Sequence, residues 1–148
     1  MFNDKIETTG ILNIQLFDET GNLKQSVEVK NLVTSAGKTF IASRMTGTAS
    51  AVMGWMALGT NATAALVADT ILGTELAGSR TVLTSSTPTA NVVAYVATFG
   101  PGVGTGSITE AGILNAASVG TLLSHTVFAT LTKLAADTLT ITWNVTIA

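Results

Sequence analysis

The sequence contains no cysteine, only two prolines and one histidine among its 148 residues. The absence of cysteine excludes disulfide bonds and thiolate chemistry from the chain. Protein sites for zinc and related metals are built mainly from several His and Cys ligands, which this composition does not supply. We therefore expect a fold held by packing and hydrogen bonds, with no metal and no other cofactor.

Charged residues are also scarce, at 11% of the chain against about 25% in a typical soluble domain. Ten of the 16 lie within residues 1–44, so the rest of the chain is almost uncharged. The net charge of −2 gives no basic surface for nucleic acid. Threonine supplies polarity instead, either on solvent-exposed strands or on surfaces that face another protein. We favour the second interpretation.

A membrane location and a secretory signal are not expected. Residues 45–68 form an uncharged run longer than the ~20 residues that span a bilayer. The run contains too many threonine, glycine and asparagine residues for hydrocarbon. The first ten residues, MFNDKIETTG, are polar and of mixed charge, without the apolar core of a signal peptide.

The clearest structural pattern lies at residues 138–147, where apolar and polar side chains alternate strictly. The apolar members are Leu139, Ile141, Trp143, Val145 and Ile147. A period of two predicts a strand with one buried face. A second β-rich run covers residues 122–131, and the short polar corner between the runs predicts that the two strands pair antiparallel.

Other segments extend this pattern upstream. Residues 10–17 and 23–30 flank a turn-forming Asp-Glu-Thr-Gly-Asn sequence and predict a hairpin. Further strands are expected at residues 53–59, 80–86 and 91–99, with a turn at 86–90 and a short helical turn at 62–67. The one helix is expected after Thr34 and Ser35, either of which can cap it, and before Gly47.

These elements predict an all-β fold, an antiparallel β-sandwich or jelly-roll-like body with one short α-helix. The length suits one compact domain. Within it we expect an N-terminal arm and hairpin at residues 1–30 and the sandwich body at residues 31–148. Residues 1–9 have no apolar period and are expected to form an arm that is disordered or ordered only by a partner.

Two groups of residues are candidates for contacts with another subunit or a capsid. Met53, Trp55 and Met56 form an adaptable apolar cluster, for which a place in the core is the more usual role. Gly102 and Gly104 belong to a glycine-rich run that is similar to phosphate-binding loops but is followed by a strand-like sequence. We expect that run to form a flexible hairpin or inter-sheet loop where subunits could meet.

Glu110 and Gly112 lie in an Ile-Thr-Glu-Ala-Gly motif, where a carboxylate can accept backbone N–H groups and fix a structural corner. His125 lies within a strand sequence, and we expect it to be structural. Glu110 with Asp137 could form the carboxylate pair of a polysaccharide-degrading enzyme. Aromatic residues, at 5%, are too few for the usual sugar platform, so no catalytic residue is predicted and the protein is not expected to be an enzyme.

Three segments resemble, in the same order, a family of small structural proteins of tailed bacteriophages. They are VEVKNLVTSAGKTFIASRM, MALGTNATAALVADTILGTEL, and ITEAGILNAASVGTLLSHTVF followed by LAADTLTITWNVTI. The resemblance covers most of residues 27–148. It implies a virion protein made in the host cytoplasm, with itself (as a homotrimer) and the major capsid protein as partners.

Within that family, two roles are considered. A trimeric capsid decoration (cement) protein would bridge neighbouring capsomers and stabilise the head. A tail-fibre, baseplate or collar protein would serve attachment to the host. The chain has neither the repeats nor the heptads of a long fibre, which favours the head.

Overall fold

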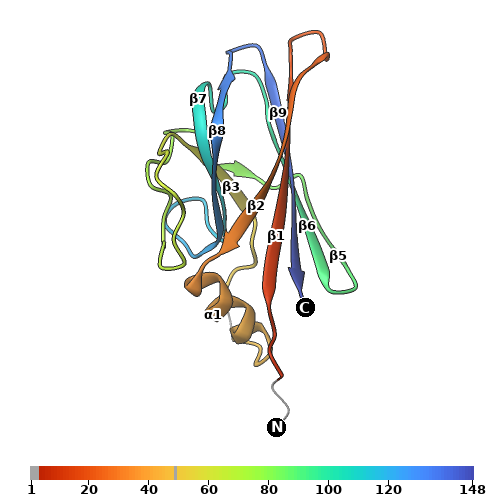
Figure 1. The fold of residues 1–148 in the computed structure, drawn as a ribbon, viewed down its shortest axis with the longest axis vertical. Helices are drawn as coiled ribbons and strands as arrows, with labels where there is room; N and C mark the ends of the chain where they lie inside the picture. The colour runs from red at the N-terminus through yellow and green to blue at the C-terminus, as the bar shows by residue number, and fades with distance from the viewer. Residues whose placement is uncertain (1–3, 49) are drawn as a thin grey trace.

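The computed structural model describes residues 4–48 and 50–148, which form nine strands and one helix (Figure 1). In chain order the elements are β1 (Thr8–Phe17), β2 (Leu23–Val33), α1 (Ser35–Arg44), β3 (Trp55–Gly59), β4 (Thr81–Val82), β5 (Ser85–Thr89), β6 (Val92–Phe99), β7 (Gly106–Leu114), β8 (Leu122–Lys133) and β9 (Thr138–Ile147). The prediction of an all-β fold with one short helix is confirmed. No helix in the described part of the chain is long and apolar enough to cross a membrane.

The strands form one curled sheet in the order β4-β3-β7-β8-β2-β1-β9-β6-β5, with every neighbouring pair antiparallel. Strand β2 makes one corner, since most of it pairs with β1 while Leu32 and Val33 pair with β8. At the other corner the Leu83 amide donates to Gly54 and the Thr84 amide to Val96. The curled sheet is therefore sandwich-like, with two halves facing each other.

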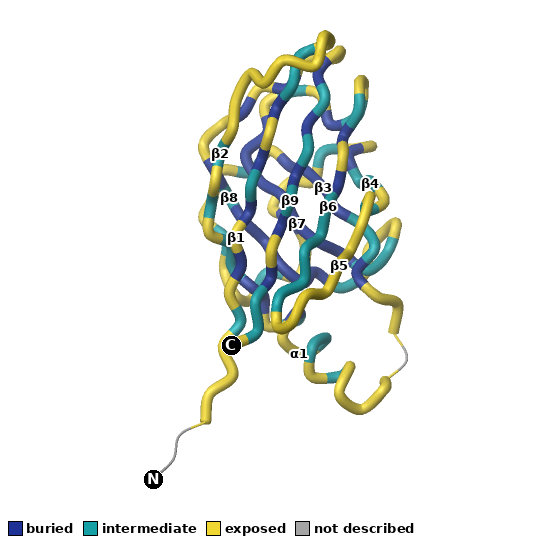
Figure 2. The backbone as a smooth tube through the Cα atoms, turned by 90° about the vertical axis from the view of Figure 1, so that its right-hand side faces the viewer, coloured by how far each residue is buried: buried dark blue, intermediate teal, exposed yellow. Residues whose placement is uncertain are grey.

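The core lies between these halves and is built from alternating strand residues (Figure 2). In β1 and β9, Leu12 lies opposite Trp143 and Ile14 opposite Ile141, and all four side chains are fully buried. Threonines occupy most of the intervening positions of β9. The period of two thus predicts this strand and its buried face correctly.

The predicted pairing of the last two strands is wrong. Strand β8 pairs with β7 and β2, whereas β9 pairs with β1 and β6. The β1–β2 hairpin, predicted correctly from its turn sequence, lies between them. The short β8–β9 connection crosses from one half of the sandwich to the other. Asp137 stabilises this connection by accepting a hydrogen bond from the Leu134 amide and forming an ion pair with Lys24. The N-terminal hairpin is consequently an integral part of the sheet.

The region around Pro88 also differs from expectation. Residues 85–89 form strand β5 and the turn falls at Ala90, whose φ is +52°. Strand β5 lies at the end of the strand order, where proline is tolerated because one side of the strand needs no hydrogen-bond partner. The strand expected at residues 80–86 is broken between β4 and β5, and no helical turn forms at 62–67.

Helix α1 begins where its capping residue predicts. The Thr34 hydroxyl accepts a hydrogen bond from the Gly37 amide at 2.9 Å and donates to the Leu122 carbonyl at 2.6 Å. The helix ends at Arg44, three residues before Gly47. Because the Thr34 amide also bonds to the Leu123 carbonyl, α1 is fixed to β8 at the end of the sandwich where the C-terminus lies (Figure 1).

Candidate functional site

Residues 60–80 connect β3 to β4 by a long loop beside β7 and β8, drawn yellow to green in Figure 1. The loop contains no helix and no named strand. Loops longer than about 12–15 residues without secondary structure are uncommon in compact domains and are often functional. The contacts that fix this loop therefore define the candidate site.

Glu110, on β7, is the central contact of the loop. Its side chain is fully buried, and Oε1 accepts from the Thr74 amide at 2.6 Å and the Asn61 amide at 3.2 Å. Oε2 accepts from the Gly73 amide at 2.9 Å and faces His125 Nε2 at 2.8 Å. The carboxylate thus joins the start of the loop to residues 73 and 74, and its four acceptor positions are all occupied.

Two glycines make room for this arrangement. Gly59 pairs with Glu110 across β3 and β7, and a Cβ at Gly59 would collide with Glu110 Oε1 and with the Thr74 carbonyl. Gly112 lies on the same strand as Glu110, and a Cβ there would lie 2.6 Å from Leu72 Cδ1. The close approach of the loop to the sheet therefore depends most on Gly59, where a side chain would meet the loop backbone, whereas at Gly112 it would meet the end of a leucine side chain.

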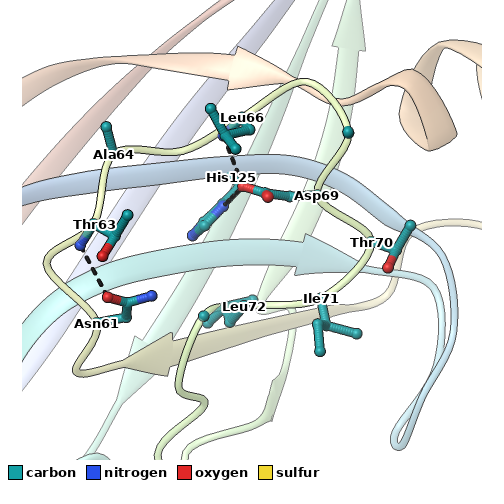
Figure 3. A pocket seen from close by; sticks show the side chains of 11 residues that line it. Asn61, Thr63, Ala64, Leu66, Asp69, Thr70, Ile71, Leu72 and His125 are labelled. Atoms are coloured by element: carbon teal, nitrogen blue, oxygen red, sulfur yellow. Dashed lines mark hydrogen bonds and ion pairs between the residues drawn. The ribbon is translucent and has the colours of Figure 1, made fainter.

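His125, on β8, extends the cluster to Asp69 in the middle of the loop (Figure 3). Its Nδ1 lies 2.7 Å from Asp69 Oδ2, while its Nε2 faces Glu110. Both contacts are hydrogen bonds when the imidazole carries a proton on each nitrogen, or when one carboxyl group is protonated. We call Glu110, His125 and Asp69 the polar clasp.

The ionisation of Asp69 reflects these contacts. Partial burial raises the pKa of its carboxyl group, but hydrogen bonds from the Leu66 amide and from His125 outweigh burial, so the net pKa lies below the usual value. The Leu66 amide donates to Asp69 Oδ2 at 2.8 Å. The ionised form of Asp69 therefore stabilises the folded loop.

An ion pair fixes the far end of the loop. Arg80 donates from Nε and Nη2 to the two oxygens of Glu75, at 2.8 and 2.6 Å. Its Nη1 donates to the carbonyls of Ala116 and Val119 in the β7–β8 connection. Bidentate geometry of this kind holds both loops in one relative position.

The clasped loop carries apolar side chains on its outer surface. Leu66, Val67 and Ile71 are 62%, 49% and 66% exposed. Between this part of the loop and His125 lies a cavity of about 290 Å³, also lined by Asn61 and Thr70 (Figure 3). The loop thus exposes apolar side chains, while its backbone is held against the sheet by the polar clasp.

The other residues proposed from the sequence lie elsewhere. Met53 and Met56 are buried in the core, and half-buried Trp55 packs against the small cluster that includes Leu72. Gly102 and Gly104 lie in the β6–β7 loop, which crosses from one half of the sandwich to the other. Both have positive φ, of +78° and +63°. Within the described residues, the side chains of the polar clasp make no hydrogen bond to either glycine or either methionine.

The carboxylate pair considered for polysaccharide cleavage is not assembled in this fold. Asp137 belongs to the β8–β9 connection and bonds to Lys24, whereas Glu110 is enclosed by the loop. Glu110 accepts from Asn61, Gly73 and Thr74 and contacts His125, whereas Asp137 contacts Lys24 and Leu134, so the two carboxylates share no hydrogen-bond partner.

Asp69 was missed from the sequence. It is 56 residues from His125, its partner. One signal was available, since Asp69, Glu75, Arg80 and Glu110 are four of the six charged residues after residue 44. Most of the few charged residues after residue 44 therefore lie in or against the 60–80 loop, where they hold it in place.

Comparison with known proteins gives no match, whether with protein families, curated proteins or solved structures.

Proposed function

We propose that this chain is a non-enzymatic structural protein of a tailed-phage particle, and specifically a trimeric decoration protein that bridges neighbouring capsomers. The observation that carries the proposal is the loop at residues 60–80, which presents exposed Leu66, Val67 and Ile71 on a backbone fixed by the polar clasp. Supporting it are the resemblance of three sequence segments to phage structural proteins and the low charge of residues 45–148.

A fixed loop is suited to contact between subunits. Apolar side chains gain free energy when another protein covers them, but binding also costs the entropy of ordering flexible segments. Here the fold has already ordered the loop, since the Val67 carbonyl accepts from the Ser35 amide and Glu110 holds residues 61, 73 and 74. We assign this loop to contacts between copies of the chain.

The β1–β2 hairpin suits a contact with the capsid. Its turn lies at the end of the sandwich opposite to α1 (Figure 1) and carries two acidic residues, half-buried Asp18 and exposed Glu19. A trimer presents three such hairpins on one rigid body. Three modest contacts that act together bind far more tightly than one, which suits a protein that joins capsid subunits.

The mass of the purified protein in solution tests the assembly step. We expect a particle of three times the 15.1 kDa chain mass at micromolar concentration. The double variant Leu66→Ser/Ile71→Ser should dissociate, whereas Leu134→Ser, at a similarly exposed leucine outside the loop, should remain trimeric. A wild-type monomer, or equal dissociation of both variants, would contradict the assignment.

Immunogold labelling of intact virions with antibody against the chain tests the location. Label distributed over the heads is expected for a decoration protein. Label confined to the tail would overturn that role and favour a fibre, baseplate or collar protein that attaches to the host. Absence of label from head and tail alike would refute the virion proposal altogether.

A further inference from the structure

A second feature, which shares no residue with the polar clasp, is an apolar cleft between α1 and the sheet. One part, of about 210 Å³, is lined by Ile41, Leu123, Val145 and Ile147. The adjoining part, of about 270 Å³, reaches Met53 and Pro88. Phe40, Arg44, Val93 and Tyr95 line both parts, so the two adjoin and form one cleft.

The cleft exists because α1 does not close the end of the sandwich completely. The helix is fixed to β8 through its N-terminal cap, but Phe40 and Ile41 are only half-buried. Protein interiors otherwise pack with few voids larger than a water molecule. Apolar cavities of roughly 150 Å³ stay dry and accept small apolar molecules, so a cleft of this size and lining suits an apolar ligand.

Arg44 and Tyr95 border the apolar walls of both parts, and Ser86 borders one of them. The Arg44 guanidinium lies 5.6 Å from the centre of the Phe40 ring and donates from Nη1 to the Ser50 carbonyl. Within the described part of the chain, its other nitrogens and the Tyr95 hydroxyl make no hydrogen bond. Burial raises the pKa of Tyr95, which keeps the phenol protonated as a donor. Both groups can donate to an anion.

The positive charge at the cleft favours a negatively charged ligand. None of the described residues that line either part is acidic, and Arg44 supplies the one charge. A small, mostly apolar pocket with a few convergent donors is the usual form of a ligand site. Because the cleft consists of two adjoining parts, a linear chain that extends from one part into the other fits it better than a compact ring.

We propose that this cleft binds a free monocarboxylate with a linear alkyl chain, whose chain lies along Val93 and Val145 and whose carboxylate accepts from Arg44 and Tyr95. The site is independent of the proposed assembly function, since none of its residues belongs to the 60–80 loop. Binding fills the gap beneath α1 and is expected to stabilise the helix against the sheet.

Calorimetric titration with decanoate, and with decanol as the uncharged probe, tests the proposal on the full-length protein. We expect decanoate to bind. Arg44→Gln should weaken the binding of decanoate by about fivefold, equivalent to about 1 kcal/mol, and leave the binding of decanol unchanged. Lys38→Gln, on the same helix but outside the cleft, should bind both probes as wild type does. Tyr95→Phe should weaken the binding of decanoate but not the binding of decanol.

A substitution that fills the cleft tests the position. Val93→Trp should abolish binding of both probes while circular dichroism shows a folded sheet. If that variant does not fold, the selective effects of Arg44→Gln and Tyr95→Phe decide the question. Failure of the wild type to bind decanoate at millimolar concentration, equal effects of Arg44→Gln and Lys38→Gln, or unchanged binding by folded Val93→Trp would each overturn the proposal.

Discussion

In the sandwich interior, Trp143 and its neighbours pack as apolar side chains on alternating strand positions. At the 60–80 loop, by contrast, three backbone N–H groups converge on one buried carboxylate. The core distributes its stabilisation over many small contacts, whereas the loop depends on a few strong ones. Removal of one core side chain should therefore destabilise the whole sheet, whereas removal of the buried carboxylate should loosen the loop and leave the sheet folded.

The largest effect is expected in the core. Trp143→Ala should destabilise the protein by about 3–5 kcal/mol, because a fully buried aromatic side chain is replaced by a cavity. Urea denaturation followed by circular dichroism measures the change. The loss should involve all strands in one transition. Retention of wild-type stability would show that the core is not the continuous unit described above.

Loss of the central carboxylate should rank next. Glu110→Ala leaves the amides of Asn61, Gly73 and Thr74 without their acceptor, and we expect a loss of about 3 kcal/mol. The variant should retain the circular dichroism of the folded sheet in the absence of urea, because the lost contacts lie at the loop. Glu28→Ala, at an exposed strand position, is the control and should change stability by less than about 0.5 kcal/mol. Equal effects at the two sites would contradict the account.

A methyl group at Gly59 should have a smaller effect. Gly59→Ala places a Cβ against Glu110 and the Thr74 carbonyl, and overpacking of this kind costs about 1–3 kcal/mol. Gly54→Ala is the matched control, since the nearest atom to its Cβ would be 3.8 Å away. The same urea experiment compares the two. A Gly59→Ala protein as stable as Gly54→Ala would show that the loop does not lie close to β3.

The smallest effect concerns pH. The folded-state pKa of Asp69 is lowered, so its contribution is present above its unfolded pKa and is lost as the pH falls through the folded value. At neutral pH, Asp69→Asn should lose about 1 kcal/mol, the net contribution of a typical hydrogen bond.

The pH dependence of urea denaturation checks this prediction. As the pH falls from about 5 to about 2, wild type should lose more stability than Asp69→Asn, and the two proteins should converge. Residual pH dependence should remain in both, because the pKa values of Asp18 and Asp137 are also lowered. Parallel curves would show that Asp69 does not stabilise the folded loop.

Local sequence patterns predicted much of the sheet. The alternation at residues 138–147 defines β9, and Thr34 caps α1 where expected. The pairing of β8 with β9 was predicted wrongly because a short connection is shared by hairpins and by crossings between the two halves of a sandwich. Only the position of the β1–β2 hairpin decides between them.

The polar clasp was less predictable for a physical reason. Glu110 could be recognised as a carboxylate beside a glycine, but its hydrogen-bond donors lie 36 to 49 residues away in a loop without periodic pattern. Backbone N–H groups are present at every such position, so the sequence does not mark which ones converge. The turn predicted at residues 86–90 was wrong for a similar reason. A strand tolerates Pro88 only because β5 lies at the end of the strand order, which the local sequence does not show.

Hydrogen–deuterium exchange at the amides of Asn61, Gly73 and Thr74 tests the central claim most directly, which is that the loop is fixed before it meets any partner. These amides should exchange as slowly as those of the core strands in wild type and much faster in Glu110→Gln. Rapid wild-type exchange at all three, at the rate of an exposed loop, would contradict the claim.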